Sequence, residues 1–285
     1  MSTHSNAKSV VISGASTGIG RACALHLDQQ GLRVFAGVRK QADADDLQQA
    51  ASSRLTPIFI NVTDTSTIAT AAEQVGSALQ GSGLTGLVNN AGVAFGGPLE
   101  FLPIEKFKIQ FDINVIGQVA VTQAFLPLLR QAQGRVINMS SVSGRIAMPF
   151  IGPYAASKFA LEALTDSLRV ELKPWGIKVI SIEPGAIKTP IWRKSLAEAD
   201  AMIEELPPQA EILYGPAMER FRKIVARTGE TGISAEVVAK TVAEALLTAR
   251  PKTRYLIGRD AKIGAFLGRF LPDRLRDWVV LQRRG

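Results

Sequence analysis

Cysteine and histidine are scarce in this 285-residue chain, which contains one cysteine, Cys23, and two histidines, His4 and His26. A single cysteine excludes an intramolecular disulfide. Because no histidine cluster accompanies it, the sequence offers no thiolate metal site, and no metal is expected. Two histidines near the N-terminus also give little basis for a Ser-His-Asp hydrolase.

Long uncharged apolar runs are lacking as well. Residues 1–8 are polar and do not resemble the apolar region of a signal peptide. We identify no uncharged segment that is long enough to span a bilayer. The sequence therefore predicts a soluble, cytoplasmic protein.

The charge balance is basic, with 33 Lys and Arg against 25 Asp and Glu and a formal net charge of +8. Such an excess suits anionic cofactors, acidic lipid surfaces or nucleic acid. The cations are scattered, and aromatic residues make up only 6% of the chain, without a base-stacking cluster. We therefore expect no nucleic-acid partner.

Apolar strand-like runs alternate with amphipathic helical patterns along the chain. The strand-like runs are 9–13, 32–38, 55–60, 84–89, 135–139, 177–182 and 253–257, and the helical patterns are 21–30, 42–51, 65–79, 104–129, 154–173 and 236–249. Nearly continuous apolar strands between helices indicate a parallel sheet covered on both faces. No linker or repeat divides the chain, so residues 1–285 are predicted to form one α/β domain, a doubly wound sheet of about seven parallel strands.

A glycine-rich turn follows the first strand and reads Gly14-x-x-x-Gly18-x-Gly20. Glycine allows a backbone to turn tightly and lie close to a pyrophosphate, which then sits at the N-terminus of the next helix. A plain strand-to-helix turn would account for the same glycines. Its position after the first strand favours a dinucleotide-binding fold of the Rossmann type.

Tyr154 and Lys158 are four residues apart in a helical pattern and therefore share one helix face. A nearby ammonium favours the phenolate and is expected to lower the tyrosine pKa. This arrangement suits a general acid/base that exchanges a proton with an alcohol oxygen.

Other polar residues follow the strands at their carboxyl ends, where ligands bind in parallel α/β sheets. They are Ser16, Asn89, Asn90, Ser141, Pro184 and Gly185. The coincidence of these residues at one edge predicts a single site there.

Five motifs together resemble the short-chain dehydrogenase/reductase family. They are Gly14-x-x-x-Gly18-x-Gly20, Asn89-Asn90-Ala91-Gly92, Asn114, Ser141 with Tyr154-x-x-x-Lys158, and Pro184-Gly185 with Thr189. The resemblance covers roughly residues 8 to 190. Around 141–158 and 183–185, the sequence is similar to the branch that contains 17β-hydroxysteroid and retinol dehydrogenases.

The resemblance implies catalytic roles for four residues. Tyr154 would exchange a proton with the substrate oxygen, and Ser141 would hydrogen-bond that oxygen. Lys158 would hold the nicotinamide ribose and lower the Tyr154 pKa. Asn114 would kink its helix and hold a water that links Lys158 to solvent. Ser140 is the rival of Ser141, although the distance to Tyr154 favours Ser141.

The resemblance also implies a nicotinamide cofactor and a set of residues that contact it. An acidic residue after the second strand would select NAD(H), but Arg39 and Lys40 stand there and suit the 2′-phosphate of NADP(H). NADP(H) is favoured, with NAD(H) as the alternative. The implied contacts are Gly14, Ser16, Thr17, Gly18, Ile19, Gly20, Arg39, Lys40, Asn61, Val62, Asn90, Ala91, Gly92, Tyr154, Lys158, Pro184, Gly185, Ile187 and Thr189.

One of these positions departs from the family, which usually has Asp-Val where this chain has Asn61-Val62. In the family, the acidic residue holds the adenine amino group. An Asn carbonyl can still accept that hydrogen bond, so we expect a weakened contact.

The parallel pattern stops at about 187–231, where the family has a lid over substrate and nicotinamide. Apolar residues in and near such a lid can line a pocket for a hydrophobic substrate. We therefore expect a bulky hydrophobic alcohol or ketone, steroid-, retinoid- or lipid-like. The predicted pocket consists of Ser141, Ser143, Phe95, Met148, Phe150 and Trp192.

The C-terminal segment, about 260–285, combines apolar and basic residues and is split by Pro272 into two short helices at most. Such a helix can lie on a membrane surface, but covering the domain or a partner subunit is favoured. The family implies a homodimer or homotetramer. The functional alternatives are a nucleotide-sugar epimerase or dehydratase of the same fold and a cofactor-binding sensor or scaffold without turnover.

Overall fold

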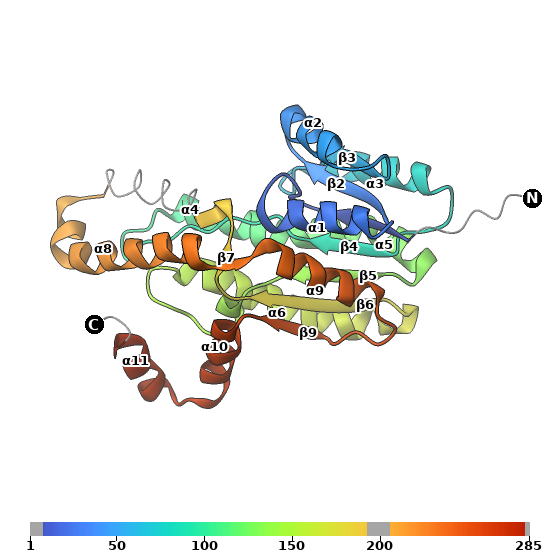
Figure 1. The fold of residues 1–285 in the computed structure, drawn as a ribbon. Helices are drawn as coiled ribbons and strands as arrows, with labels where there is room; N and C mark the ends of the chain where they lie inside the picture. The colour runs from blue at the N-terminus through green and yellow to red at the C-terminus, as the bar shows by residue number, and fades with distance from the viewer. Residues whose placement is uncertain (1–7, 193–205, 283–285) are drawn as a thin grey trace, which may run out of the picture.

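The sheet has seven parallel strands in the order β3-β2-β1-β4-β5-β6-β9 (Figure 1). The computed structural model describes residues 8–192 and 206–282. The strands are β1 (Ser9–Ile12), β2 (Arg33–Val38), β3 (Leu55–Phe59), β4 (Gly86–Asn89), β5 (Arg135–Met139), β6 (Lys178–Pro184) and β9 (Arg254–Ile257). The strand order reverses between β1 and β4, which is where ligands bind in such folds.

Helices cover both faces of the sheet because successive side chains of each strand point to opposite sides. Val10 and Ile12 enter one core, with α1 (Gly18–Gln29), α2 (Gln41–Ala50) and α9 (Ala235–Leu247). Val11 enters the other, with α3 (Thr65–Leu79) and α5 (Gly117–Ala132). The end of α6 (Gly152–Glu171) also packs on this second core through Leu168. The predicted doubly wound α/β fold is confirmed.

A long helical segment runs from α4 (Ile104–Phe111) through a π-helical turn (Asp112–Ile116) into α5. It contains an 18-residue window of mean hydropathy 1.3, long and apolar enough by composition to cross a membrane. The prediction that no segment of the chain is long and apolar enough to span a bilayer is therefore wrong. Part of the window, 44%, is buried within the protein. Val121, Phe125 and Leu129 are completely buried in the core, so the segment is a core helix here.

The predicted lid region contains more regular structure than its sequence pattern indicated. A long helix, α8 (Pro208–Thr231), extends beyond the end of the sheet (Figure 1). The short strands β7 (Ile187–Lys188) and β8 (Ile233–Ser234) pair in parallel at its base. Residues 193–205 of the predicted lid lie outside the described part of the chain.

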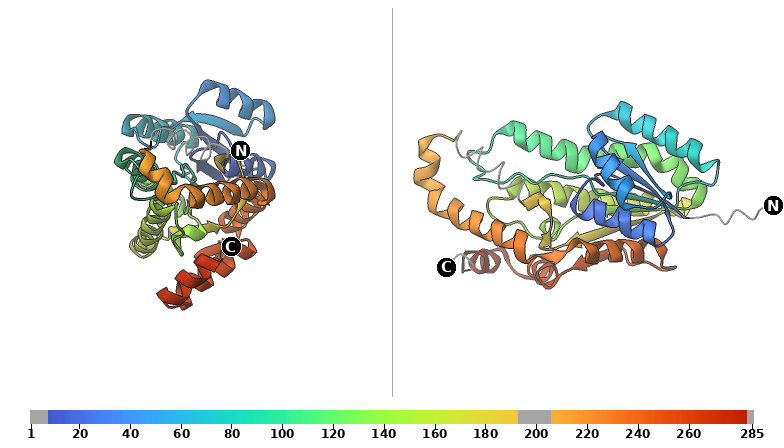
Figure 2. Two further views of the ribbon diagram at one scale, coloured as in Figure 1. Left: turned by 90° about the vertical axis from the view of Figure 1, so that its left-hand side faces the viewer. Right: turned by 45° about the horizontal axis from the view of Figure 1, so that its top comes forward.

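Two C-terminal helices, α10 (Arg259–Phe270) and α11 (Asp273–Gln282), flank Pro272 as predicted. They extend away from the sheet in Figure 1 and in the left view of Figure 2. The inner face of α10 lies against the loop after β5, since a Cβ added at Gly268 would lie 2.2 Å from the Arg145 carbonyl oxygen. Phe266 and Phe270 are exposed on α10. Contact of these helices with a membrane or a partner subunit stays a prediction, and residues 283–285 lie outside the described residues.

Candidate active site

The glycine turn between β1 and α1 brings three backbone segments into close contact. Gly14 and Gly18 have φ angles of +66° and +59°, a region that L side chains rarely adopt. A Cβ at Gly14 would lie 2.8 Å from the Ala91 Cα, and one at Gly20 would lie 2.2 Å from the Gly14 carbonyl oxygen. Asn90 completes the turn by donating from Nδ2 to the Gly14 carbonyl oxygen at 2.9 Å. Only glycine fits at these positions, and the N-terminus of α1 is left open to an anion.

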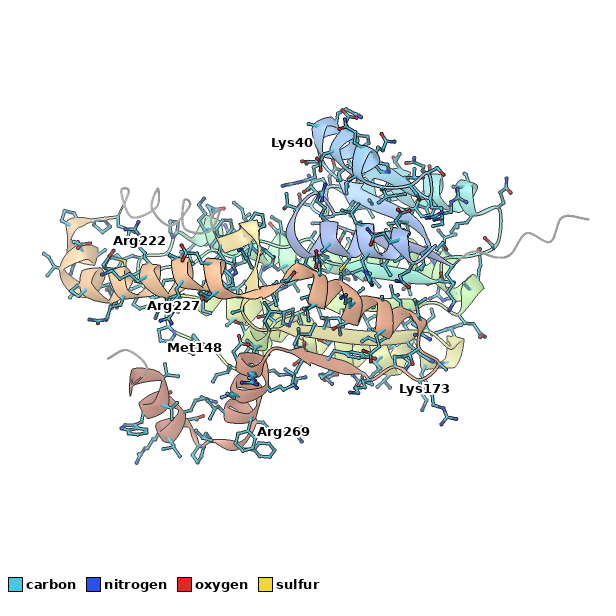
Figure 3. The ribbon with its side chains drawn as sticks, viewed as in Figure 1. Lys40, Met148, Lys173, Arg222, Arg227 and Arg269 are labelled. Atoms are coloured by element: carbon cyan, nitrogen blue, oxygen red, sulfur yellow. The ribbon has the colours of Figure 1, made fainter. Side chains whose placement is uncertain are left out.

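A cavity opens from this turn along the carboxyl ends of the strands. Its lining includes most of the predicted cofactor residues, namely Gly14, Ser16, Thr17, Gly18, Ile19, Arg39, Asn61, Val62, Asn90, Ala91, Gly92, Tyr154, Lys158, Pro184, Gly185, Ile187 and Thr189. Gly20 is not part of the lining because it packs behind the turn. Lys40 is also outside it: the residue is exposed at the start of α2, at the top of Figure 3.

Sequence reasoning missed several apolar residues of the cavity wall. They are Gly37, Val38, Ile60, Val93, Ile113, Met139 and Pro190; Ile191, in the predicted lid, also lines the cavity. Val38, Ile60 and Met139 are the last residues of predicted strands. Their position could have identified them as cavity residues, because ligands bind at the carboxyl ends of the strands. Ile113 comes from the π-helical turn, and the sequence pattern gave no indication of it.

Lys158 and Tyr154 both face the cavity from α6. The Lys158 Nζ donates to the Met139 carbonyl oxygen at 2.8 Å and lies 5.7 Å from the centroid of the Tyr154 ring. Burial lowers the pKa of Lys158 to about 8, although the charge of Glu162 acts in the opposite direction. A backbone carbonyl therefore holds the ammonium, and burial brings the pKa of Lys158 closer to neutral pH.

The pKa of Tyr154 is raised, because burial removes solvent from the phenolate, and a hydrogen bond with Ser141 lowers it only in part. The expected lowering of this pKa is thus wrong in its net direction, because burial outweighs the hydrogen bond with Ser141. The sequence placed Tyr154 and Lys158 on one helix face, but it could not show that burial would raise the pKa of the phenol.

Ser141 also lines the cavity, at the start of the short turn after β5. Its Oγ accepts from the Ser143 backbone nitrogen at 3.1 Å. Ser140, its rival, lines the same cavity, and its buried Oγ has no hydrogen-bond partner within the described structure. Ser141 therefore remains the better candidate, because its hydroxyl is the one hydrogen-bonded with Tyr154.

Asn114 stands in the π-helical turn, in agreement with the predicted distortion of its helix. It does not line the cavity. Its Oδ1 accepts from the Val93 nitrogen at 2.9 Å, and its Nδ2 donates to the Ser157 Oγ at 3.0 Å. The Ser157 Oγ in turn donates to the Tyr154 carbonyl oxygen at 2.7 Å. Asn114 therefore connects the loop after β4 to the helix that carries Tyr154.

The predicted substrate wall is only partly assembled around this cavity. Ser141 and Trp192 line it, whereas Ser143, Phe95, Met148 and Phe150 do not. Phe150 instead packs against Tyr214 and Phe221 of α8, with ring centroids 6.4 and 5.6 Å away. Met148 is half-buried on the loop between β5 and α6, drawn between α8 and α10 in Figure 3. Phe150 thus packs on the lid helix instead of lining the cavity, and the sequence could not show this because it depends on the position of α8.

Sequence comparisons place the chain among known oxidoreductases. A family model described as short chain dehydrogenase matches residues 8–200. The chain is 41% identical to mouse retinol dehydrogenase 5 over 277 residues, which cover 95% of this chain and 87% of that protein. It is 36% identical to bovine 17-beta-hydroxysteroid dehydrogenase type 6, covering 98% and 89% of the two chains. It is 35% identical to an NADPH-dependent 3-dehydrocapnine reductase of Ornithobacterium rhinotracheale, covering 94% of each.

The comparison with solved structures agrees with the family match. A crystal structure of a short-chain dehydrogenase from Streptomyces avermitilis matches with a TM-score of 0.77 and 28% identity, covering 99% of both chains. With the glycine turn, the cavity and the Ser141–Tyr154–Lys158 group already described, the family match assigns the class of chemistry. The chain belongs to the short-chain dehydrogenases, in their retinol and hydroxysteroid dehydrogenase-like branch, and is an NAD(P)-dependent oxidoreductase that acts on CH–OH groups.

Proposed function

We propose that this enzyme uses NADP(H) to interconvert a bulky hydrophobic alcohol and its carbonyl, with a steroid-, retinoid- or lipid-like substrate. The observation that carries the proposal is the presence of Ser141, Tyr154 and Lys158 in the wall of one cavity that also contains the glycine turn. The names of the retinol and hydroxysteroid dehydrogenase relatives support the substrate class. The joint presence of these three residues with Asn114 favours turnover over a sensor or scaffold.

The residues of the cavity fit a nicotinamide dinucleotide. The glycine turn and the α1 N-terminus suit its pyrophosphate, since a Cβ at Gly14 or Gly20 would close the approach. Arg39 lies where the adenosine end would be held, and Lys158 lies beside Tyr154 at the other end. When bound, the nicotinamide ring supplies the hydride chemistry.

In the proposed mechanism, side chains of the protein bind the substrate oxygen and transfer its proton. The Ser141 hydroxyl hydrogen-bonds the substrate oxygen and orients it toward Tyr154. During alcohol oxidation the Tyr154 phenolate takes the hydroxyl proton, and during carbonyl reduction the phenol returns it. Lys158, when protonated, stabilises the phenolate.

We expect opposite pH profiles for the two directions. The raised pKa of Tyr154 leaves the phenol protonated at neutral pH, as reduction requires, whereas oxidation requires the phenolate. The rate of alcohol oxidation should therefore increase through the alkaline range. The rate of reduction should be level near neutral pH and decline in the alkaline range. Ser141→Ala removes the hydrogen bond that lowers the Tyr154 pKa and should move the alkaline limb to higher pH. Plots of kcat/KM against pH test this, and an oxidation rate that is independent of pH would contradict it.

The NADP(H) preference is proposed from Arg39, which lines the cavity and is exposed. A guanidinium can bind a 2′-phosphate through two hydrogen bonds. Hydrogen bonds to charged groups contribute about 1.5–3 kcal/mol, so Arg39→Ala should lower kcat/KM for NADPH roughly 10- to 100-fold and change that for NADH little. The NADPH-dependent relative supports this cofactor.

Lys40→Ala is the matched control, because Lys40 carries the same charge next to Arg39 but lies outside the cavity. Its effect on NADPH should be the smaller of the two. Equal losses in both variants would assign the preference to general charge attraction. A wild-type enzyme that prefers NADH would reject the NADP(H) proposal and favour the NAD(H) alternative.

A further inference from the structure

Three side-chain amides on one helical segment bind alternate residues of the loop that follows β4. The Gln110 Oε1 accepts from the Phe95 nitrogen at 2.6 Å. Asn114 accepts from the Val93 nitrogen through Oδ1 and donates to the Val93 carbonyl oxygen through Nδ2, both at 2.9 Å. The Gln118 Nε2 donates to the Ala91 carbonyl oxygen. We call these three residues, Gln110, Asn114 and Gln118, the amide ladder.

The spacing of the ladder follows from the geometry of helix and loop. Four helical residues rise about 6 Å, and two residues of extended chain cover about 6.6 Å, so each step of four along the helix meets a step of two along the loop. In a plain α-helix, a residue four positions on is rotated about 40° from the first. The π-helical turn Asp112–Ile116 closes through one more residue, which offsets this rotation. The distortion at Asn114 therefore keeps Gln110 and Gln118 in line with it.

The loop backbone meets a different amide atom of each glutamine, although the Gln118 Nε2 also donates to the Ile113 carbonyl oxygen of its own helical segment at 3.3 Å. Gln110 meets an N–H group and presents its oxygen, whereas Gln118 meets a carbonyl and presents its nitrogen. Both side chains are buried, with exposed fractions of 0% and 2%. The other amide atom of each, Gln110 Nε2 and Gln118 Oε1, has no hydrogen-bond partner within the described structure. A buried polar atom without a partner is destabilising. An apolar side chain would therefore be more stable at either position if the loop contacts had no role.

The loop held by the ladder borders the reactive end of the cavity. Ala91, Gly92 and Val93 line it, and a Cβ at Gly92 would lie 3.9 Å from the Lys158 Nζ. Further along, the Gly97 nitrogen donates to the Phe150 carbonyl oxygen at 2.7 Å, and Phe150 packs on the lid helix α8. The loop thus runs from the cofactor cavity to the lid support, and the ladder fixes its path between them.

We propose that Gln110 and Gln118 are positioning residues for the oxidoreductase reaction. Through the amide ladder, Gln118 sets the backbone at Ala91, which lines the cavity, and Gln110 sets the backbone at Phe95, on the part of the loop nearer to the lid. The kinetic part of this proposal rests on the proposed function. The part that concerns loop order and cofactor affinity does not require turnover.

The test uses the full-length protein and the variants Gln110→Met and Gln118→Met, which keep side-chain length and remove the hydrogen bond. Gln123→Met, an exposed position on the same helical segment, is the matched control. Amide hydrogen exchange of the 91–95 segment is measured without cofactor, because a hydrogen bond of ordinary net strength changes local opening about fivefold. Exchange in this segment should accelerate about fivefold in both ladder variants and not in the control.

Binding and kinetics then separate the two glutamines. Gln118→Met should increase the Kd for NADPH, measured by fluorescence, several-fold more than Gln110→Met does. Gln110→Met should mainly increase the KM for the ketone. Unchanged exchange at 91–95, or equal losses of thermal stability with unchanged Kd and KM, would overturn the proposal. If the wild type turns over no ketone, the proposed function fails, while exchange and Kd still test the ladder.

Glutamate variants provide a second test that holds even if a methionine variant does not fold. At position 110 a carboxylate still offers an acceptor to the Phe95 N–H, whereas at position 118 it places an acceptor against the Ala91 carbonyl. Gln110→Glu should therefore preserve cofactor Kd and loop protection better than Gln118→Glu at a pH where the carboxylates are charged. Equal effects, or the reverse order, would overturn the proposal.

Discussion

Replacing Tyr154 by Phe is expected to lower kcat about 10²- to 10⁴-fold in both reaction directions, which is the usual contribution of a general acid/base. The variant loses the hydroxyl group that transfers the proton and keeps the ring beside the Lys158 ammonium. The glycine turn and Arg39 are untouched, so the Kd for NADPH should stay close to that of the wild type. Stopped-flow or steady-state absorbance of the nicotinamide measures kcat, and fluorescence titration measures the Kd.

Tyr255→Phe is the matched control for this experiment. Tyr255 is buried in β9, and its hydroxyl accepts from the Lys252 nitrogen at 3.2 Å, outside the cavity. This variant should keep its turnover. Full activity in Tyr154→Phe would assign the proton transfer to another group. A wild type that binds cofactor tightly but turns over no ketone would favour the sensor alternative in place of the proposed reaction.

The fold was predictable because the sheet is buried on both faces. A strand such as Val10–Ile12 sends side chains into two cores, and so it has to be apolar at every position. The glycine turn was predictable for a related reason: a Cβ at Gly14 or Gly20 would lie less than 3 Å from a backbone atom, which leaves no other residue type. Both signals arise from steric requirements that act on neighbouring residues of the sequence.

Properties that depend on three-dimensional surroundings were not predictable. The raised pKa of Tyr154 comes mainly from burial, and Lys40 is not part of the cavity lining although Arg39 beside it is. Phe150 has a φ angle of +68° and contacts α8, a helix 58 residues or more away in the sequence. The amide ladder likewise depends on a π-helical turn, for which periodicity gives no signal.

The ion pairs behind Ser141 show the same limitation, since no local pattern joins Arg145, Glu162, Glu183 and Arg254. Arg145 donates to both Glu183 oxygens, at 2.8 and 3.0 Å, and lies 3.4 Å from Glu162. Arg254 lies 3.3 Å from each of the two carboxylates. Glu183 is only 1% exposed. The network connects the turn that carries Ser141 to α6, β6 and β9.

Arg145→Met is expected to destabilise the protein by about 3 kcal/mol, because removing one partner of a buried ion pair leaves charge without compensation. This figure is at the lower end of the usual range, since 32% of the Arg145 side chain is exposed and Arg254 still faces both carboxylates. Chemical denaturation of wild type and variant at about pH 8 measures the difference. Arg254→Met is a matched comparison, as it removes the second guanidinium from the same carboxylates.

The pH dependence of this loss distinguishes buried charge from lost packing. Burial already raises the pKa of Glu183, and Arg145 opposes that increase, so the pKa should rise further in Arg145→Met. A carboxyl whose folded-state pKa is raised contributes stability below its unfolded pKa and loses that contribution as the pH rises through the folded-state pKa. The deficit of Arg145→Met should therefore shrink as the pH falls toward about 4, where carboxyls begin to protonate. The additional change Glu183→Gln should recover part of the loss at about pH 8. A deficit that is equal at both pH values and unaffected by Glu183→Gln would show that Arg145 stabilises this region by packing alone.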